Sequence, residues 1–104
     1  MTRYTVEFSA RAKRDLYAEW AYIAREAPLN ATRWVERMEE AVLGLAEFPE
    51  RCPRAREASK AGIDLRQQLV NGHRVLFVVQ RRKVRVLHIR HGRRRDAGSK
   101  EVSG

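Results

Sequence analysis

The stretch RVLFVVQRRKVRVLHIRHGRRR, residues 74–95, decides the fold of this chain. It holds two short apolar runs, 75–79 and 84–89, whose β-branched and aromatic residues are typical of buried strands. The polar residues 80–83 between the runs predict the turn of a β-hairpin. A hairpin this apolar is not stable alone in water, so the rest of the chain must cover it.

The residues before this hairpin predict two helices as its cover. Residues 4–8 alternate apolar and polar side chains and predict a strand, after which Ser9 has the side chain of a helix N-cap. Apolar residues three and four apart predict one helix over 10–27 and a second over 30–47, with Asn30 as its N-cap. Pro28 breaks the pattern between them. Two helices joined by so short a link are expected to pack as an antiparallel hairpin.

Two kinds of side chain on these helices carry specific expectations. Trp20 and Trp34 belong to the apolar stripes, which predicts core packing rather than stacking on nucleic-acid bases. Asp15 and Glu19 are expected on the opposite, solvated face of the first helix.

The remaining segments complete the predicted sheet. Residues 50–61 have no periodicity and predict an irregular loop, whereas 62–70 alternates imperfectly and predicts a strand. Asn71 and Gly72 both tolerate the positive φ of a type I′ turn, so they predict a hairpin to the next strand. The order strand, helix, helix, strand, strand, strand predicts an α+β fold, a small and mostly antiparallel sheet packed on an N-terminal helical hairpin.

Length and composition bound the possible functions. The 104 residues predict one domain over 1–96 with a flexible tail over 97–104. No apolar run is long enough to span a membrane, and the first residues lack a secretion signal, so a cytoplasmic location without membrane association is expected. Cys52 is the only cysteine, which excludes an internal disulfide and a cysteine metal cluster.

The charge is concentrated in the second half of the chain. Residues 1–50 carry 7 basic and 9 acidic groups, net −2, whereas residues 51–104 carry 15 basic and 4 acidic groups, net +11. Such a field attracts a polyanion, which can be RNA, DNA or an acidic protein. The strands and the basic end of the chain therefore hold the candidate contacts with a target or partner, which are Arg66, Arg74, Arg90, Arg93 and Arg94.

The helical hairpin covers only one face of the predicted sheet. The other face, with Arg66, Arg74, Arg85 and Arg90 in or near it, is expected to be concave, basic and partly apolar.

Other catalytic and metal-binding patterns are weak. His88 and His91 are three residues apart on a strand, which places them on opposite faces and predicts no metal site. Asp64 with a histidine forms an acid/base pair only if the fold brings them together. The serines lie in no nucleophile motif and the glycines form no phosphate loop, so no cofactor is expected.

Four segments together resemble the RelE/ParE superfamily of toxins from bacterial type II toxin–antitoxin systems: AKRDLYAEWAYIA, AVLGLAEFPE, LRQQLVNGHRVLFVV and VRVLHIRHGRRR. The resemblance covers about residues 3–96 and is closer to the ParE branch, whose members are often labelled plasmid stabilisation proteins. It implies the fold described above, a cognate acidic, ParD-like antitoxin and a lethal target in the host cell. RelE-like members are ribonucleases that cut messenger RNA on the ribosome, whereas ParE-like members poison DNA gyrase.

The residues match the nuclease pattern only in part. Arg74, in Gly72-His73-Arg74, and Arg94, in Gly92-Arg93-Arg94, align with two catalytic arginines of RelE-like enzymes. Leu65 and Gln67 occupy the positions of that family's lysine pair, and its C-terminal tyrosine has no counterpart. Each lost group of this kind is worth about 2 to 4 kcal/mol of transition-state stabilisation.

The partial match favours a toxin that binds and inhibits gyrase and is not an enzyme. One alternative is a ribosome-dependent endoribonuclease, with Arg74 and Arg94 on the phosphate and His91 as acid or base. Another is a harmless relative that only binds its partner.

Overall fold

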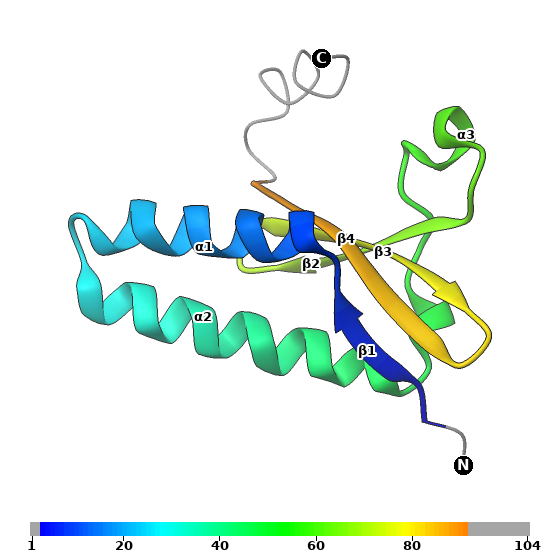
Figure 1. The fold of residues 1–104 in the computed structure, drawn as a ribbon, viewed down its shortest axis with the longest axis horizontal. Coiled ribbons are helices and arrows are strands. Elements are labelled where there is room, and N and C mark those ends of the chain that lie inside the picture. Colours follow the sequence, from blue (N-terminus) through cyan, green and yellow to red (C-terminus); the bar gives the residue numbers. More distant parts are fainter. Residues whose placement is uncertain (1–2, 92–104) are drawn as a thin grey trace.

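The fold is given by a computed structural model, which describes residues 3–91 (Figure 1). Strand β1 (Thr5–Phe8) leads into the long helices α1 (Ala10–Ala24) and α2 (Pro28–Leu43). Two 3₁₀ turns, η1 (Gly44–Ala46) and η2 (Pro49–Arg51), and the short helix α3 (Ala58–Ala61) follow. The chain then forms β2 (Leu65–Val70), β3 (His73–Gln80) and β4 (Lys83–His91).

The sheet has four strands in the order β1-β4-β3-β2. Strands β2, β3 and β4 are antiparallel neighbours, whereas β1 lies parallel to β4, with Thr5 opposite Lys83 and Phe8 opposite Val86. Helices α1 and α2 form an antiparallel hairpin beside the sheet (Figure 1). The predicted α+β fold and the predicted order of elements are therefore confirmed.

The helix ends differ from the prediction at several points. Ser9 caps α1 as expected, because its hydroxyl accepts the Ala12 N–H at 3.0 Å. The first helix ends at Ala24 rather than at residue 27, and the second begins at Pro28, so Asn30 is not its N-cap. Proline suits the first position of a helix, where its missing N–H is not needed.

Three predicted segments are also shorter or more structured than expected. The second helix ends at Leu43 and continues as a 3₁₀ turn, and the segment predicted as an irregular loop contains η2 and α3. The strand predicted over 62–70 begins at Leu65.

The main core lies between the helical hairpin and one face of the sheet. Phe77, Met38, Val75, Val84 and Val86 are fully buried there. Trp34 is 8% exposed and belongs to the same core, and Trp20 packs against it, which confirms the core prediction for both tryptophans.

A smaller core covers part of the opposite face of the sheet. Ala55 and Ala58 pack there against Leu65, Leu76 and Val78. Backbone hydrogen bonds hold the covering segment along β2, from Ala55 N–H to the Leu65 carbonyl at 2.8 Å and from Gln67 N–H to the Pro53 carbonyl at 3.0 Å. The face that was expected to be concave, basic and partly apolar is therefore partly covered, because residues 53–61 fold over it.

The hairpin turns follow the backbone preferences of their residues. Asn71 has φ 48° and Gly72 has φ 81°, so both are positive, as a type I′ turn requires. The β3–β4 turn consists of Arg81 and Arg82, with Arg81 at φ 57°, and is shorter than the predicted turn over 80–83. None of the helices within residues 3–91 has the length and apolarity that crossing a bilayer requires.

Candidate functional site: the arginine face of the sheet

Three arginines project from the face of the sheet that points away from α1 and α2. Arg74 on β3 lies directly opposite Arg90 on β4, and Arg85 lies opposite Val78, which belongs to the smaller core on this face. Because side chains alternate along a strand, the pairing places all three arginines on one side. We call Arg74, Arg85 and Arg90 the arginine face.

Arg74 is buried, with 9% of its side chain exposed, and its guanidinium is bound within the chain. Nη1 and Nη2 donate to the two carboxylate oxygens of Glu57 at 2.9 and 2.7 Å. Nε and Nη2 also donate to the side-chain oxygen of Gln67, at 3.0 and 2.7 Å. The hydrogen bonds from Arg74 lower the pKa of Glu57 from 4.5 to about 2. A phosphate approaching Arg74 would have to displace this carboxylate.

Arg66 lies on the other face, because it is opposite Phe77 of the main core. Its Nη1 donates to the carbonyls of Glu50 and Cys52 at 2.9 and 2.8 Å, and Nη2 lies 3.2 Å from an Asp64 carboxylate oxygen. The prediction that Arg66 shares a face with the other arginines was wrong, since its register on β2 turns it toward the segment after α2.

The remaining predicted arginines differ in what surrounds them. Arg85 is about half exposed and donates to Glu7 at 2.7 Å. Arg90 is partly exposed, and its buried Nε has no hydrogen-bond partner within residues 3–91. Burial lowers the pKa of His88, and the positive charge of Arg90 lowers it further, whereas the Asp15 carboxylate raises it. Arg93 and Arg94, with the predicted tail 97–104, lie outside the described residues.

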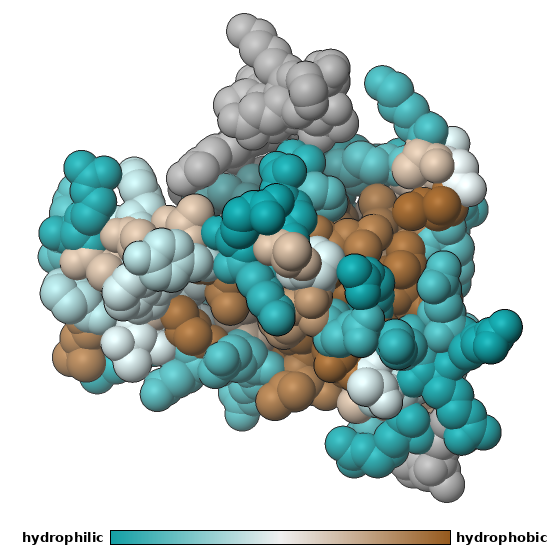
Figure 2. Space-filling view, in the orientation of Figure 1, coloured by the Kyte–Doolittle hydropathy of each residue, from teal (hydrophilic) through white to brown (hydrophobic). Residues whose placement is uncertain are grey.

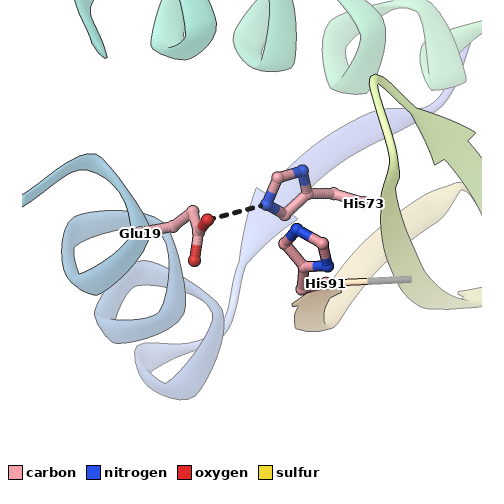
Figure 3. Close-up of side chains that lie close together, drawn as sticks. All are labelled: Glu19, His73 and His91. Carbon is pink, nitrogen blue, oxygen red and sulfur yellow. Dashed lines mark ion pairs between the residues drawn. The ribbon is translucent and has the colours of Figure 1, made fainter. Parts of the chain in front are cut away.

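His91 points to the helical side of the sheet, where it meets two side chains (Figure 3). It lies opposite His73, and the two rings have their centroids 4.9 Å apart. His73 is buried, its Nε2 lies 3.1 Å from a carboxylate oxygen of Glu19, and its Nδ1 lies 3.4 Å from the indole nitrogen of Trp34 and 3.2 Å from the Asn71 carbonyl oxygen. Arg74 and His91, both named for the nuclease alternative, are thus on opposite faces.

The prediction that Asp15 and Glu19 are solvated was wrong. Their side chains are only 18% and 13% exposed. Asp15 accepts the Ile89 backbone N–H at 3.0 Å, which satisfies a donor at the edge of β4 beyond the end of β1. The signal was present in the sequence, because Glu19 stands three residues after Leu16 and four before Ile23, the spacing of one helix face.

Sequence and structure comparisons agree with this architecture. Residues 6–96 match the family described as the ParE toxin of the type II toxin–antitoxin system parDE. The fold is similar to that of a chromosomal ParDE toxin–antitoxin system from P. aeruginosa, with TM-score 0.73 and 18% identity over 86% of this chain and 96% of that one. It is also similar to the RelBE2 toxin–antitoxin complex from Mycobacterium tuberculosis, with TM-score 0.62 and 23% identity over 86% of this chain and 99% of that one.

No curated protein matches the sequence significantly. At these identities the two solved structures establish the fold alone, whereas the family match covers most of the chain. The chain therefore belongs to the ParE toxin family of type II toxin–antitoxin systems.

Proposed function

We propose that this toxin inhibits DNA gyrase by stoichiometric binding and does not turn over a substrate. The observation that carries the proposal is the separation of Arg74 and His91. Arg74–Arg90 and His73–His91 are neighbouring cross-strand pairs of β3 and β4. The two arginines therefore point to one face of the sheet and the two histidines to the other. A ribonuclease that held a phosphate with Arg74 and moved a proton with His91 would need both groups on one side.

The immediate surroundings of Arg74 support the same proposal. Glu57 already neutralises its charge, and Gln67 accepts two hydrogen bonds from it. Leu65 is buried in the smaller core, so neither position that carries a lysine in RelE-like enzymes supplies a proton-transfer group here. Positioned acids and bases contribute about 10²- to 10⁴-fold to such reactions.

We further propose that an acidic, ParD-like antitoxin neutralises the toxin in the cytoplasm. The two similar structures come from toxin–antitoxin systems, and the net charge of +9 favours an acidic partner. Figure 2 shows apolar side chains reaching the surface among hydrophilic ones. Large apolar side chains with much exposed surface are Leu29, Leu43, Phe48, Ile63 and Leu69. A partner segment that is acidic and partly apolar, and that orders on docking, suits such a surface.

The target is tested with two assays on the purified protein. We expect it to block supercoiling by gyrase at near-equimolar ratio and to leave messenger RNA on translating ribosomes intact. Arg90→Ala should weaken gyrase inhibition, whereas Arg14→Ala, which removes an exposed basic side chain of α1, should not. Ribosome-dependent cleavage that is lost on His91→Ala would establish the nuclease alternative instead.

The partner is tested by co-expression with the neighbouring open reading frame. We expect a complex that survives purification and relieves growth inhibition. Unchanged solubility and toxicity would count against an antitoxin encoded there.

A further inference from the structure

We propose that Glu19, His73 and His91 form a binding site for Zn²⁺ (Figure 3). Their ligand atoms all lie within 4.8 Å of one another. The three residues come from α1, β3 and β4, so a bound ion would join the helical hairpin to the end of the sheet. This inference does not depend on the proposed target of the toxin.

The spacing of the ligand atoms suits a tetrahedral ion. With zinc–ligand distances of about 2.0 to 2.2 Å, neighbouring ligand atoms around tetrahedral zinc are about 3.3 Å apart. Nε2 of His73 and Oε2 of Glu19 are already 3.1 Å apart. The ligand atoms of the cluster are at most 4.8 Å apart. A rotation of the His91 ring, at the end of β4, is therefore enough to bring its nitrogen to the distance that a bound ion requires.

The strongest observation is the state of His73 Nε2. The His73 side chain is 7% exposed, and this nitrogen has no hydrogen-bond partner within the described chain, although Glu19 lies beside it. Nδ1 of the same ring lies 3.2 Å from the Asn71 carbonyl oxygen. A proton on Nδ1 donated to that carbonyl leaves a lone pair on Nε2 that faces the Glu19 carboxylate. Two electron-rich atoms so close repel each other unless a proton or a metal ion lies between them, and with the proton on Nδ1 a metal ion can take that place.

This arrangement is also the usual support of a histidine ligand. Metal-bound histidines donate their other ring N–H to a carbonyl or carboxylate, which fixes the tautomer. The Trp34 indole N–H, 3.4 Å from Nδ1, favours the opposite tautomer, with the proton on Nε2. The contact with Asn71 is the shorter of the two, and Nδ1 cannot donate to one group and accept from the other at once.

The donor set selects the kind of metal. Two imidazoles and one carboxylate are ligands that suit Zn²⁺, with water as the fourth ligand. Mg²⁺ prefers an all-oxygen octahedral shell, which this cluster does not supply. His91 is partly exposed, so an ion and its water can reach the site from solvent.

The test is a Zn²⁺ titration of untagged, full-length protein by isothermal calorimetry, with Mg²⁺ in parallel. We expect one Zn²⁺ per chain, a higher thermal unfolding temperature with Zn²⁺, and no effect of Mg²⁺. Glu19→Gln and His91→Ala should each weaken Zn²⁺ binding by more than about 10-fold. His88→Ala should not, and it is a matched control because His88 is on the same strand and also lies near a carboxylate, Asp15 at 3.7 Å. Equal Zn²⁺ binding by all three variants, or none by the unmodified protein, would overturn the proposal.

A second measurement uses the unmodified protein and is unaffected by whether a variant folds. Co²⁺ in the same site should give the visible bands of tetrahedral coordination by nitrogen and oxygen. An octahedral spectrum, or the charge-transfer band of a thiolate, which only Cys52 could supply, would overturn the assignment.

Discussion

The Glu57 carboxylate binds the Arg74 guanidinium through two parallel hydrogen bonds of 2.9 and 2.7 Å between residues 17 positions apart. Glu57 precedes α3 and Arg74 lies on β3, so the pair fixes the segment 53–61 on the arginine face. Only 19% and 9% of the two side chains are exposed. Removing one partner of a buried pair is costly, because the other charge stays in a poorly solvated place.

Glu57→Gln should therefore lower the free energy of unfolding by about 3 kcal/mol. The neutral amide keeps the shape of the side chain and removes the charge that balances Arg74. Urea denaturation measures the change. Glu47→Gln is the control, because Glu47 pairs with Arg3 at the exposed surface, and its loss should cost less than about 1 kcal/mol. Similar small effects of both substitutions would contradict a stabilising role for the buried pair.

Acid should weaken this pair in a defined pH range. The pKa of Glu57 falls from 4.5 to about 2 on folding, so the folded chain holds the carboxylate charged where the unfolded chain binds a proton. The resulting stability is present above pH 4.5 and is lost as the pH falls toward about 2. At most it amounts to about 3 kcal/mol. Urea unfolding at several pH values should show the difference between the unmodified protein and Glu57→Gln shrinking across this range. A constant difference would be inconsistent with the lowered pKa.

His88 should make stability fall at mildly acidic pH. Burial and the charge of Arg90 lower the pKa of His88 from 6.5, so the unfolded chain binds the proton more readily. The free energy of unfolding should decrease as the pH falls through 6.5, and His88→Gln should reduce that decrease. NMR titration of the imidazole gives the pKa directly. A His88 pKa above 6.5 in the folded protein would reverse the predicted sign.

Ser9→Ala should cost about 1 to 2 kcal/mol. The Ser9 hydroxyl accepts the Ala12 N–H at 3.0 Å and donates to the Leu87 carbonyl at 3.1 Å, so it caps α1 and joins the helix to β4. Thermal or urea unfolding measures the loss. Ser59→Ala, at an exposed position of α3, is the matched control and should change stability by less than about 0.5 kcal/mol.

Gly72→Ala and Gly44→Ala should have opposite effects. A Cβ at either position meets no atom within 4 Å, so backbone conformation alone decides the outcome. Gly72 has φ 81°, where a side chain is strained by about 1 to 2 kcal/mol. Gly44 has φ −63°, which alanine adopts readily, so Gly44→Ala should stabilise by about 0.4 to 1 kcal/mol. Equal effects of the two substitutions would mean that crowding, not φ, governs the positions.

Sequence patterns predicted the local elements because each depends on near neighbours. The two-residue alternation of 4–8, the apolar spacing of the two helices, the Ser9 cap and the positive φ of Asn71 and Gly72 all follow from residues close in the chain. The predicted helix ends differ from the observed ones, because a proline such as Pro28 serves as the first residue of a helix as readily as it breaks one.

The site could not be predicted in the same way, because it depends on pairing between distant strands. The register that turns Arg66 toward the segment after α2 and His91 toward α1 is fixed only when β2, β3 and β4 assemble. Glu19 and His73 are likewise far apart in sequence, and only the docking of α1 on the sheet brings them together. The burial of Asp15 and Glu19 depends on this docking, although the spacing of Glu19 from Leu16 and Ile23 places it beside the apolar stripe.

The parallel pairing of β1 with β4 also determines when the molecule can be completed. Strand β1 leaves the ribosome well before its partner, the segment of β4 from Lys83 to Val86, has been made. A nascent chain that ends before this segment has both long helices and no central strand to receive β1. Folding of the complete sheet must therefore wait until β4 has been synthesised, and a chain that terminates before β4 cannot reach the native topology.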